Sequence, residues 1–398
     1  MKKDRVLFVY EDFSAGGSTT SFFELLRAWD YEKYDVDILP YRLTDTERER
    51  IARLLPDCVN ILENAVNLGN SPLHKVVKGI KAACCPHYYR ALRAKKKGAN
   101  KYVVLQHMAY AKRAICRRIT GNYRAVISFI EGWSTAFALS DKICADKRIV
   151  FVHLDYKSAG LLADIDRKLL GRADGIAAVS ESCAIGLKEL YPEYKDRITV
   201  IENLHSVDLI RRKSVEGLDS GECGRSDFLT VCRPDIHVKG LDRLRDAAVI
   251  LRDMGYRFKW TVVGVGGDAR VRALFENQGL EEFVTLVDTV DNPFPYYTRA
   301  DWLVVTSRTE AKPMTVTEAQ ILGVPCIVTE YSSAREQVHC GEDGIITENT
   351  TEGIVSALRS VLDDNSIRGR FAEALKKKTV TADADTVLGK LYSIIDGK

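Results

Sequence analysis

Short hydrophobic runs alternate along the chain with longer segments whose hydrophobic residues recur every three or four positions. Runs such as residues 5–10 (RVLFVY), 148–155 (RIVFVHLD) and 302–306 (WLVVT) are typical of strands that are covered on both faces. The longer segments, such as residues 18–29, are typical of amphipathic helices. Because strands that alternate with helices pair in parallel, the pattern predicts an α/β protein of two doubly wound, Rossmann-like domains facing one cleft.

The clearest break in this pattern is a stretch of Ser, Gly and alternating charges at residues 205–226, which is typical of a linker. It predicts a first domain over residues 1–204 and a second over residues 227–375, each long enough to bury its own core. The remaining residues, 376–398, contain a helical pattern over Val387 to Ile395.

A glycine pair follows the first predicted strand. Gly16 and Gly17 make a turn, and Ser18 is expected to cap the helix that follows. A strand, a glycine-rich turn and a helix start are typical of a nucleotide-binding α/β domain, although the G-x-G-x-x-G fingerprint is absent. The alternative is a turn that binds no ligand.

The stretch from residue 307 to 328 contains the most informative candidate binding residues. A polar loop follows the strand WLVVT, and Pro313 suits the first position of a helix. The backbone N–H groups of Met314 and Thr315 would then point out of the helix start, where an anion is favoured. Glu310 and Glu318 lie on either side, so the pattern predicts a phosphate site flanked by two acids that hold sugar hydroxyls. The alternative for Glu318 is an ordinary exposed helix glutamate.

The spacing of these residues resembles a known signature. Glu310 and Glu318 are separated by seven residues and are followed by Ala319, an apolar pair and Gly-Val-Pro at 323–325. This arrangement resembles family 4 glycosyltransferases, which are retaining enzymes of GT-B fold. The resemblance implies a nucleotide-diphosphate sugar as donor and no bound metal or other cofactor. Lys312 departs from the pattern, because the family often has a small or aromatic residue there.

The resemblance also assigns roles in the second domain. Arg233 and Lys239 stand where the family carries two cations that clamp the donor diphosphate, and Arg and Lys suit phosphate oxygens. Glu318 would hold the ribose hydroxyls and Glu310 the sugar ring. The alternative for Arg233 and Lys239 is simple exposure at a strand end. The resemblance further implies that the second domain holds the donor sugar and the first domain the acceptor. In this fold a last helix generally crosses back onto the first domain, as residues 376–398 are expected to do.

Polar residues also end a strand of the first domain. His153 and Asp155 close the run RIVFVHLD, and such residues project into the crevice where α/β sheets bind ligands. In the resembling family a histidine here contacts the donor sugar or an acceptor hydroxyl, and Gly16 and Gly17 would let the backbone approach both substrates. A later tyrosine pair, Tyr296 and Tyr297, is expected to pack rather than to take part in the chemistry.

Charge is strongly segregated along the chain. Residues 64–130 contain fourteen Lys and Arg and no Asp or Glu; the whole chain carries only +3, so the remainder carries −11. Within this region the stripe Leu73, Val76, Val77 and Ile80 lies beside lysines. A basic, aromatic-bearing surface suits an anionic membrane. A solvated basic face packed on the sheet is the alternative, and nucleic acid is disfavoured because its recognition motifs are absent.

Cysteine and histidine usage indicates neither disulfides nor metal. The ten cysteines form no C-x-x-C pair and most fall in hydrophobic patterns, so we expect buried free thiols in a reducing cytoplasm. The seven histidines lack metal-ligand spacing. The N-terminus reads as a first strand rather than a signal peptide, and no hydrophobic stretch is long enough to span a bilayer.

The resemblance, together with the basic region, implies a glycosyltransferase of hexosyltransferase type that acts in cell-surface polysaccharide synthesis. Its acceptor would be a glycan or a polyprenyl-linked glycan, and its location would be the inner face of the plasma membrane. Two alternatives stay open: another GT-B sugar-nucleotide enzyme, such as an epimerase or a phosphorylase, and a non-catalytic membrane-bound scaffold. The residues specify neither the base and sugar of the donor nor the linkage formed.

Overall fold

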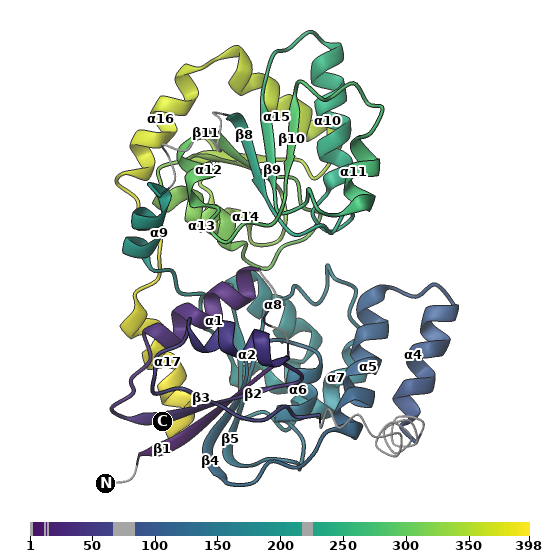
Figure 1. The fold of residues 1–398 in the computed structure, drawn as a ribbon, viewed down its shortest axis with the longest axis vertical. Coiled ribbons are helices and arrows are strands. Elements are labelled where there is room, and N and C mark those ends of the chain that lie inside the picture. Colours follow the sequence, from purple (N-terminus) through teal and green to yellow (C-terminus); the bar gives the residue numbers. More distant parts are fainter. Residues whose placement is uncertain (1–2, 12, 14–15, 67–83, 217–225) are drawn as a thin grey trace. The chain divides into compact units, whose positions relative to one another are not determined.

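The computed structural model describes residues 3–11, 13, 16–66, 84–216 and 226–398. Contacts divide the chain into two compact units, each built on one parallel sheet (Figure 1). The first unit comprises residues 1–14, 18–204 and 382–398, and the second comprises residues 15–17 and 205–381.

The sheet of the first unit has seven strands in the order β3-β2-β1-β4-β5-β6-β7, and neighbouring strands pair in parallel. The strands are β1 (Asp4–Tyr10), β2 (Tyr34–Pro40), β3 (Asn60–Ile61), β4 (Asn122–Ser128), β5 (Cys144–Val152), β6 (Gly175–Ala178) and β7 (Ile198–Val200). The chain runs outward from β1 to β3 and then crosses to β4, on the other side of β1. The boundary between β1 and β4 is therefore a topological switch point, outside which α/β proteins bind ligands.

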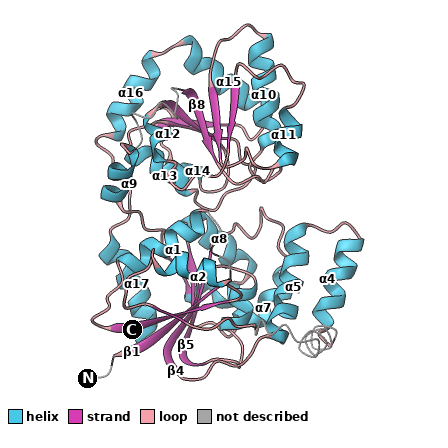
Figure 2. Ribbon diagram, in the orientation of Figure 1, coloured by secondary structure: helices cyan, strands magenta, loops and turns pink. Residues whose placement is uncertain are grey.

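Hydrophobic side chains pack on both faces of this sheet, because alternate residues of a strand point to opposite faces. In β1, Val6 and Phe8 belong to one buried cluster, and Leu7 and Val9 belong to another. The helices around the strands (Figure 2) are α1 (Gly17–Arg27), α2 (Asp45–Ala52), α4 (Pro86–Lys96), α5 (Lys101–Ile115), α6 (Trp133–Ala138), α7 (Ala163–Leu170), α8 (Glu181–Leu190), the 3-10 helix η1 (Pro192–Arg197) and α17 (Ala384–Asp396).

The C-terminal helix α17 belongs to the first unit. Its residues Val387, Leu388, Leu391 and Ile395 recur at helical spacing and are buried in the same cluster as Phe8. The chain therefore returns to the first domain after completing the second.

The sheet of the second unit has six parallel strands in the order β10-β9-β8-β11-β12-β13. The strands are β8 (Ser226–Val231), β9 (Trp260–Val263), β10 (Val284–Val287), β11 (Ala300–Val305), β12 (Cys326–Thr329) and β13 (Gly344–Thr347). Here the chain runs outward from β8 to β10 and then crosses to β11. The switch point of this sheet lies between β8 and β11.

Both faces of the second sheet are also covered. Phe228 and Val262 belong to one buried cluster, and Leu229 and Val263, their neighbours in the strands, belong to another. The helices of this unit are α9 (Val207–Ser214), α10 (Leu241–Asp253), α11 (Ala269–Phe275), α12 (Phe294–Thr298), α13 (Met314–Ile321), α14 (Ala334–Gln337), α15 (Thr351–Asp363) and α16 (Ser366–Leu375). Two doubly wound Rossmann-like domains, as the sequence predicts, are thus confirmed.

Part of the segment that we expected to be a linker is helical. Helix α9 occupies residues 207–214 within it, and Ser206 caps the helix by accepting a hydrogen bond from the backbone N–H of Leu209. Ile210 is buried in a core cluster of the second unit. One buried residue among many charges is a weak signal in sequence, which is why composition alone indicated a linker.

The cysteines depart from expectation. The nine described cysteines are free, but only Cys116, Cys183 and Cys326 are buried, whereas Cys58, Cys84, Cys144 and Cys340 are exposed. The prediction of buried thiols was therefore wrong for those four: Cys58, Cys84 and Cys340 lie between helices and strands, and Cys144 is the first residue of β5. The hydrophobic stripe at residues 73–80 lies outside the described residues. Within the described part of the chain, no helix has the length and hydrophobicity needed to cross a membrane.

Candidate functional site

The two loops at the β8/β11 switch point carry the predicted site residues of the second domain. β8 leads into residues 232–240, with Arg233 exposed near its beginning and Lys239 near its end. β11 leads into residues 306–313, which contain Glu310. Because the carboxyl ends of adjacent parallel strands lie at one edge of the sheet, both loops border the crevice where ligands bind.

An ion pair joins these loops. Lys239 Nζ lies 2.6 Å from Glu310 Oε1, and the Ser307 hydroxyl donates to the same oxygen over 2.7 Å. Burial alone would lower the pKa of the Lys239 ammonium, but the adjacent Glu310 carboxylate outweighs it and raises that pKa above its usual value. Lys239 therefore remains charged at the edge of the sheet; its ammonium has three donor hydrogens and, within the described part of the chain, donates to one carboxylate oxygen.

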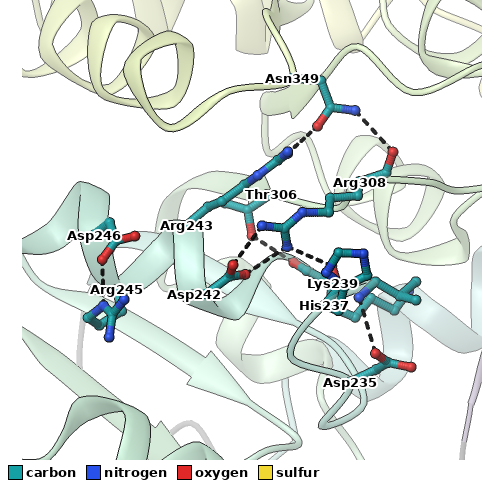
Figure 3. Close-up of polar contacts among 11 residues, drawn as sticks. Asp235, His237, Lys239, Asp242, Arg243, Arg245, Asp246, Thr306, Arg308 and Asn349 are labelled. Carbon is teal, nitrogen blue, oxygen red and sulfur yellow. Dashed lines mark hydrogen bonds and ion pairs between the residues drawn. The ribbon is translucent and has the colours of Figure 1, made fainter. Parts of the chain in front are cut away.

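A second ionic contact fixes the position of the two loops relative to each other (Figure 3). The Arg308 guanidinium donates to both oxygens of Asp242, over 2.7 and 2.6 Å, and also to the His237 carbonyl over 2.8 Å. The Thr306 hydroxyl donates to the Lys239 carbonyl over 2.8 Å. A two-pronged arginine–carboxylate contact fixes orientation as well as distance. Sequence reasoning missed Arg308 and Asp242, because 66 residues separate them.

Gly240 allows this close approach. Its φ is +64°, in the left-handed region, and a Cβ atom there would overlap the Thr306 carbonyl oxygen. Any other residue would therefore push the Lys239 loop away from the β11 loop.

Helix α13 begins beside Glu310. Pro313 is its N-cap with extended backbone, so the prediction that Pro313 is the first helical residue was wrong by one position, and Met314 begins the helix. Among the described residues, no side chain caps this start. The N–H groups of Met314 and Thr315 therefore have no intrahelical partner and suit an anion.

Glu318 lies on the same helix and is buried, with only 7% of its surface exposed. Burial raises the pKa of its carboxyl to about 7, although a hydrogen bond from Tyr297 works in the opposite direction. The Tyr297 hydroxyl donates to Glu318 Oε2 over 2.8 Å. The alternative of an exposed helix glutamate is therefore wrong, and Tyr297 does more than pack.

His153 follows β5 directly, in the first unit. Its Nε2 atom is buried and has no hydrogen-bond partner among the described residues. A hydrogen bond to the Phe129 backbone raises the pKa of the ring, but burial outweighs it and lowers that pKa to about 4. Because Nε2 has no partner, Nδ1 donates to the Phe129 carbonyl, which leaves Nε2 of the neutral ring as an acceptor.

Glu131 supports the backbone at His153. Its Oε1 atom accepts hydrogen bonds from the backbone N–H groups of His153 and, over 2.7 Å, Leu154. Burial raises the pKa of the Glu131 carboxyl to about 7, against the lowering effect of these bonds. Sequence reasoning missed this residue. The Asp155 carboxylate accepts hydrogen bonds from the backbone N–H groups of Lys157 and Ser158 and from the Ser158 hydroxyl. It therefore stabilises the turn that follows β5.

The glycine pair lies at the start of α1. Gly16 precedes this helix and Gly17 is its first residue, so Ser18 is inside the helix and the prediction that it caps α1 was wrong. No cluster of three or more His, Cys, Asp and Glu side chains suited to a metal ion occurs among the residues with described positions.

Comparison with known proteins places this geometry in context. Residues 225–378 match the family model of glycosyl transferases group 1. These residues span the second sheet and both loops at its switch point. No curated protein matches the chain.

Solved structures match nearly the whole chain at low identity. Anabaena HepE in complex with UDP-glucose has a TM-score of 0.71 and 13% identity, over 99% of this chain and 100% of that one. Sucrose-phosphate synthase from Thermosynechococcus elongatus has a TM-score of 0.68 and 15% identity, with the same coverage. A Staphylococcus aureus TarM variant, bound to fondaparinux, α-GlcNAc-glycerol and UDP, has a TM-score of 0.69 and 11% identity, again with this coverage. The fold is therefore GT-B, and the matches support a GT-B glycosyltransferase.

The elevated pKa of Glu318 predicts a pH-dependent stability. The folded protein binds the Glu318 proton more tightly than the unfolded chain, whose carboxyl has a pKa of about 4.5. The contribution of this group is therefore fully present below pH 4.5 and is lost as the pH rises through about 7, at about 1.4 kcal/mol for each unit of difference. Glu318→Gln should lose less stability than wild type between pH 5 and pH 8, as measured by urea midpoints.

The matched control is Glu281→Gln, at an exposed glutamate of the same domain. It should follow the wild-type pH dependence. If the urea midpoints of Glu318→Gln and wild type changed with pH in the same way, Glu318 would not titrate in this range.

Proposed function

We propose that the chain is a retaining glycosyltransferase, similar to family 4 enzymes, that transfers a hexose from a nucleotide-diphosphate sugar to a glycan or a lipid-linked glycan. The observation that carries this proposal is the Lys239–Glu310 ion pair at the β8/β11 switch point, beside the open start of α13. Complexes of similar structures with UDP and UDP-glucose make a uridine donor the first candidate.

The cations of the second domain would bind the diphosphate. In the transfer, the bond between the sugar carbon and the phosphate oxygen breaks, and its electron pair leaves with the diphosphate. Arg233, Lys239 and the Met314 and Thr315 N–H groups would stabilise the negative charge that develops there. In this proposal the positive side chains take the place that a metal ion holds in other phosphate sites, so no bound metal or cofactor is required.

The carboxylates would bind hydroxyl groups of the donor. Glu318 would accept from the ribose hydroxyls, with Tyr297 holding its other oxygen in place. Glu310 would exchange part of its contact with Lys239 for a hydroxyl of the sugar ring. Neither acid is proposed as a covalent nucleophile. His153 would accept a hydrogen bond from a sugar or acceptor hydroxyl through Nε2, and Gly16 and Gly17 would let the backbone approach the substrates.

Arg233→Ala tests the diphosphate role. Removing one donor that stabilises the charge of a transition state typically lowers turnover about a hundred- to a thousandfold. We expect that loss in nucleoside diphosphate release from UDP-glucose, UDP-galactose or UDP-N-acetylglucosamine, without a change in melting temperature. Proton NMR of the first product would show retention as an unchanged anomeric configuration.

The control is Arg257→Ala, because Arg257 is exposed in the same domain but precedes β9 at the opposite, amino edge of the sheet. It should keep wild-type turnover. An Arg233→Ala enzyme as active as the control would exclude Arg233 from the donor site.

We also propose a peripheral contact with anionic membrane through the helices α4 and α5, which pack against each other (Figure 1). Tyr89 and Leu92 of α4 and Leu105 of α5 are exposed hydrophobic residues. The last turn of α4 is basic, and Lys95 and Lys96 there have no carboxylate partner among the described ion pairs. Exposed hydrophobic groups beside unpaired cations are the combination that anionic bilayers bind. In cells this would place the protein on the cytoplasmic face of the plasma membrane, in surface polysaccharide synthesis.

Sedimentation with lipid vesicles tests this contact. The protein should bind vesicles that contain 30% phosphatidylglycerol, bind neutral phosphatidylcholine vesicles weakly, and dissociate at high salt. Leu92→Ser should reduce binding several-fold. Leu92 and Met254 are both 48% exposed, and Met254 lies in the second domain, so Met254→Ser is the matched control. Equal binding of both variants, or equal binding to both lipids, would contradict the membrane contact.

A further inference from the structure

The switch point of the first sheet carries a charged pair that the proposed donor site does not use. Glu11 follows β1, and Lys112 comes from α5, 101 residues later. Lys112 Nζ donates to Glu11 Oε1 in a direct ion pair. The arrangement parallels the Lys239–Glu310 pair in the second domain, because each lysine meets a glutamate that follows a central strand at its carboxyl edge.

This pair is open to solvent and adjoins aromatic side chains. The side chain of Lys112 is 34% exposed and that of Glu11 is 21% exposed. Lys112 Nζ lies 5.2 Å from the ring centroid of Tyr41, which follows β2, and Tyr41 packs on Trp133 at 4.8 Å between ring centroids. Residues that follow three strands therefore lie close together: Glu11 after β1, Tyr41 after β2 and Trp133 after β4.

The loop after β4 connects the Lys112–Glu11 pair to His153. Gly132 has a φ of +88°, and a Cβ atom there would lie 3.8 Å from Glu11 Oε2, so the loop passes directly beside the pair. The preceding residue, Glu131, holds the backbone of His153. The buried Nε2 atom of His153, for which the described residues offer no hydrogen-bond partner, therefore belongs to a strand end that is held by the same loop.

The chemistry of the pair indicates its ligand. An ammonium donates hydrogen bonds and a carboxylate accepts them, whereas a hydroxyl does both. Two neighbouring hydroxyls of a sugar can therefore bind Lys112 and Glu11 together. Because the two charges cancel, the pair offers no net charge to attract an anion. A neutral carbohydrate fits better than a phosphate or a carboxylate.

We propose that Lys112 and Glu11, bordered by Tyr41, form a subsite that binds a neutral sugar residue of the acceptor through two adjacent hydroxyls. This inference rests on the proposed function and names the residues that would hold a sugar of its acceptor.

Saturation-transfer NMR tests the subsite with the full-length protein and methyl glycosides of glucose, galactose, mannose and N-acetylglucosamine, with and without UDP. At least one glycoside should receive saturation from wild type. Lys112→Met and Glu11→Gln should each weaken its binding about ten- to a hundredfold, as expected when a hydrogen bond to a charged group is lost. Lys188→Met, at an exposed lysine of α8 in the same domain, should bind as wild type does.

Melting temperature and UDP binding, measured on the same samples, separate the two proposals. Unchanged UDP binding with lost glycoside binding in both variants supports the subsite. Absence of saturation for every glycoside in a wild-type protein that binds UDP would overturn the subsite but not the donor site. Equal glycoside binding by wild type and both variants would also overturn it. If the wild-type protein did not bind UDP, the result would instead count against the proposed function.

Discussion

The half-buried ammonium of Lys239 is the feature on which the second-domain site depends. A charge held at the edge of a sheet is costly unless it is paired, and Glu310 provides that partner across the switch point. The Arg308–Asp242 contact and the absence of a side chain at Gly240 keep the two loops close enough for the pair to form. The loops are therefore fixed before any ligand arrives, which lowers the cost of ordering them on binding.

Much of the fold follows from the sequence because parallel strands covered on both faces appear as unbroken hydrophobic runs. β1, β5 and β11 lie within or beside the runs RVLFVY, RIVFVHLD and WLVVT. The same reasoning predicted where a ligand would bind, since polar residues that follow such runs border the crevice of the sheet. Glu310 was selected from the polar loop after WLVVT and Lys239 through the family resemblance, and the structure brings the two together.

Other candidate residues of each domain depend on contacts between distant segments, which leave little trace in the sequence. Tyr297 reaches Glu318 across 21 residues, and Glu131 reaches the backbone of His153 across 22. Neither pair has a spacing that distinguishes it from chance. The capping position of Pro313 differs from prediction by one residue and the helical start at Gly17 by two, because helix ends are set by local hydrogen bonds that hydrophobic periodicity does not encode.

The central claim is that the second domain binds a nucleotide at the β8/β11 switch point, with Glu318 on the ribose. Thermal unfolding of wild type and Glu318→Ala with UDP, GDP, ADP and CMP tests it most directly. One nucleotide should stabilise wild type by about 2 to 3 kcal/mol at a hundred times its dissociation constant, and Glu318→Ala should lose most of this gain. The account would be contradicted if a nucleotide stabilised both proteins equally, or if no nucleotide stabilised wild type.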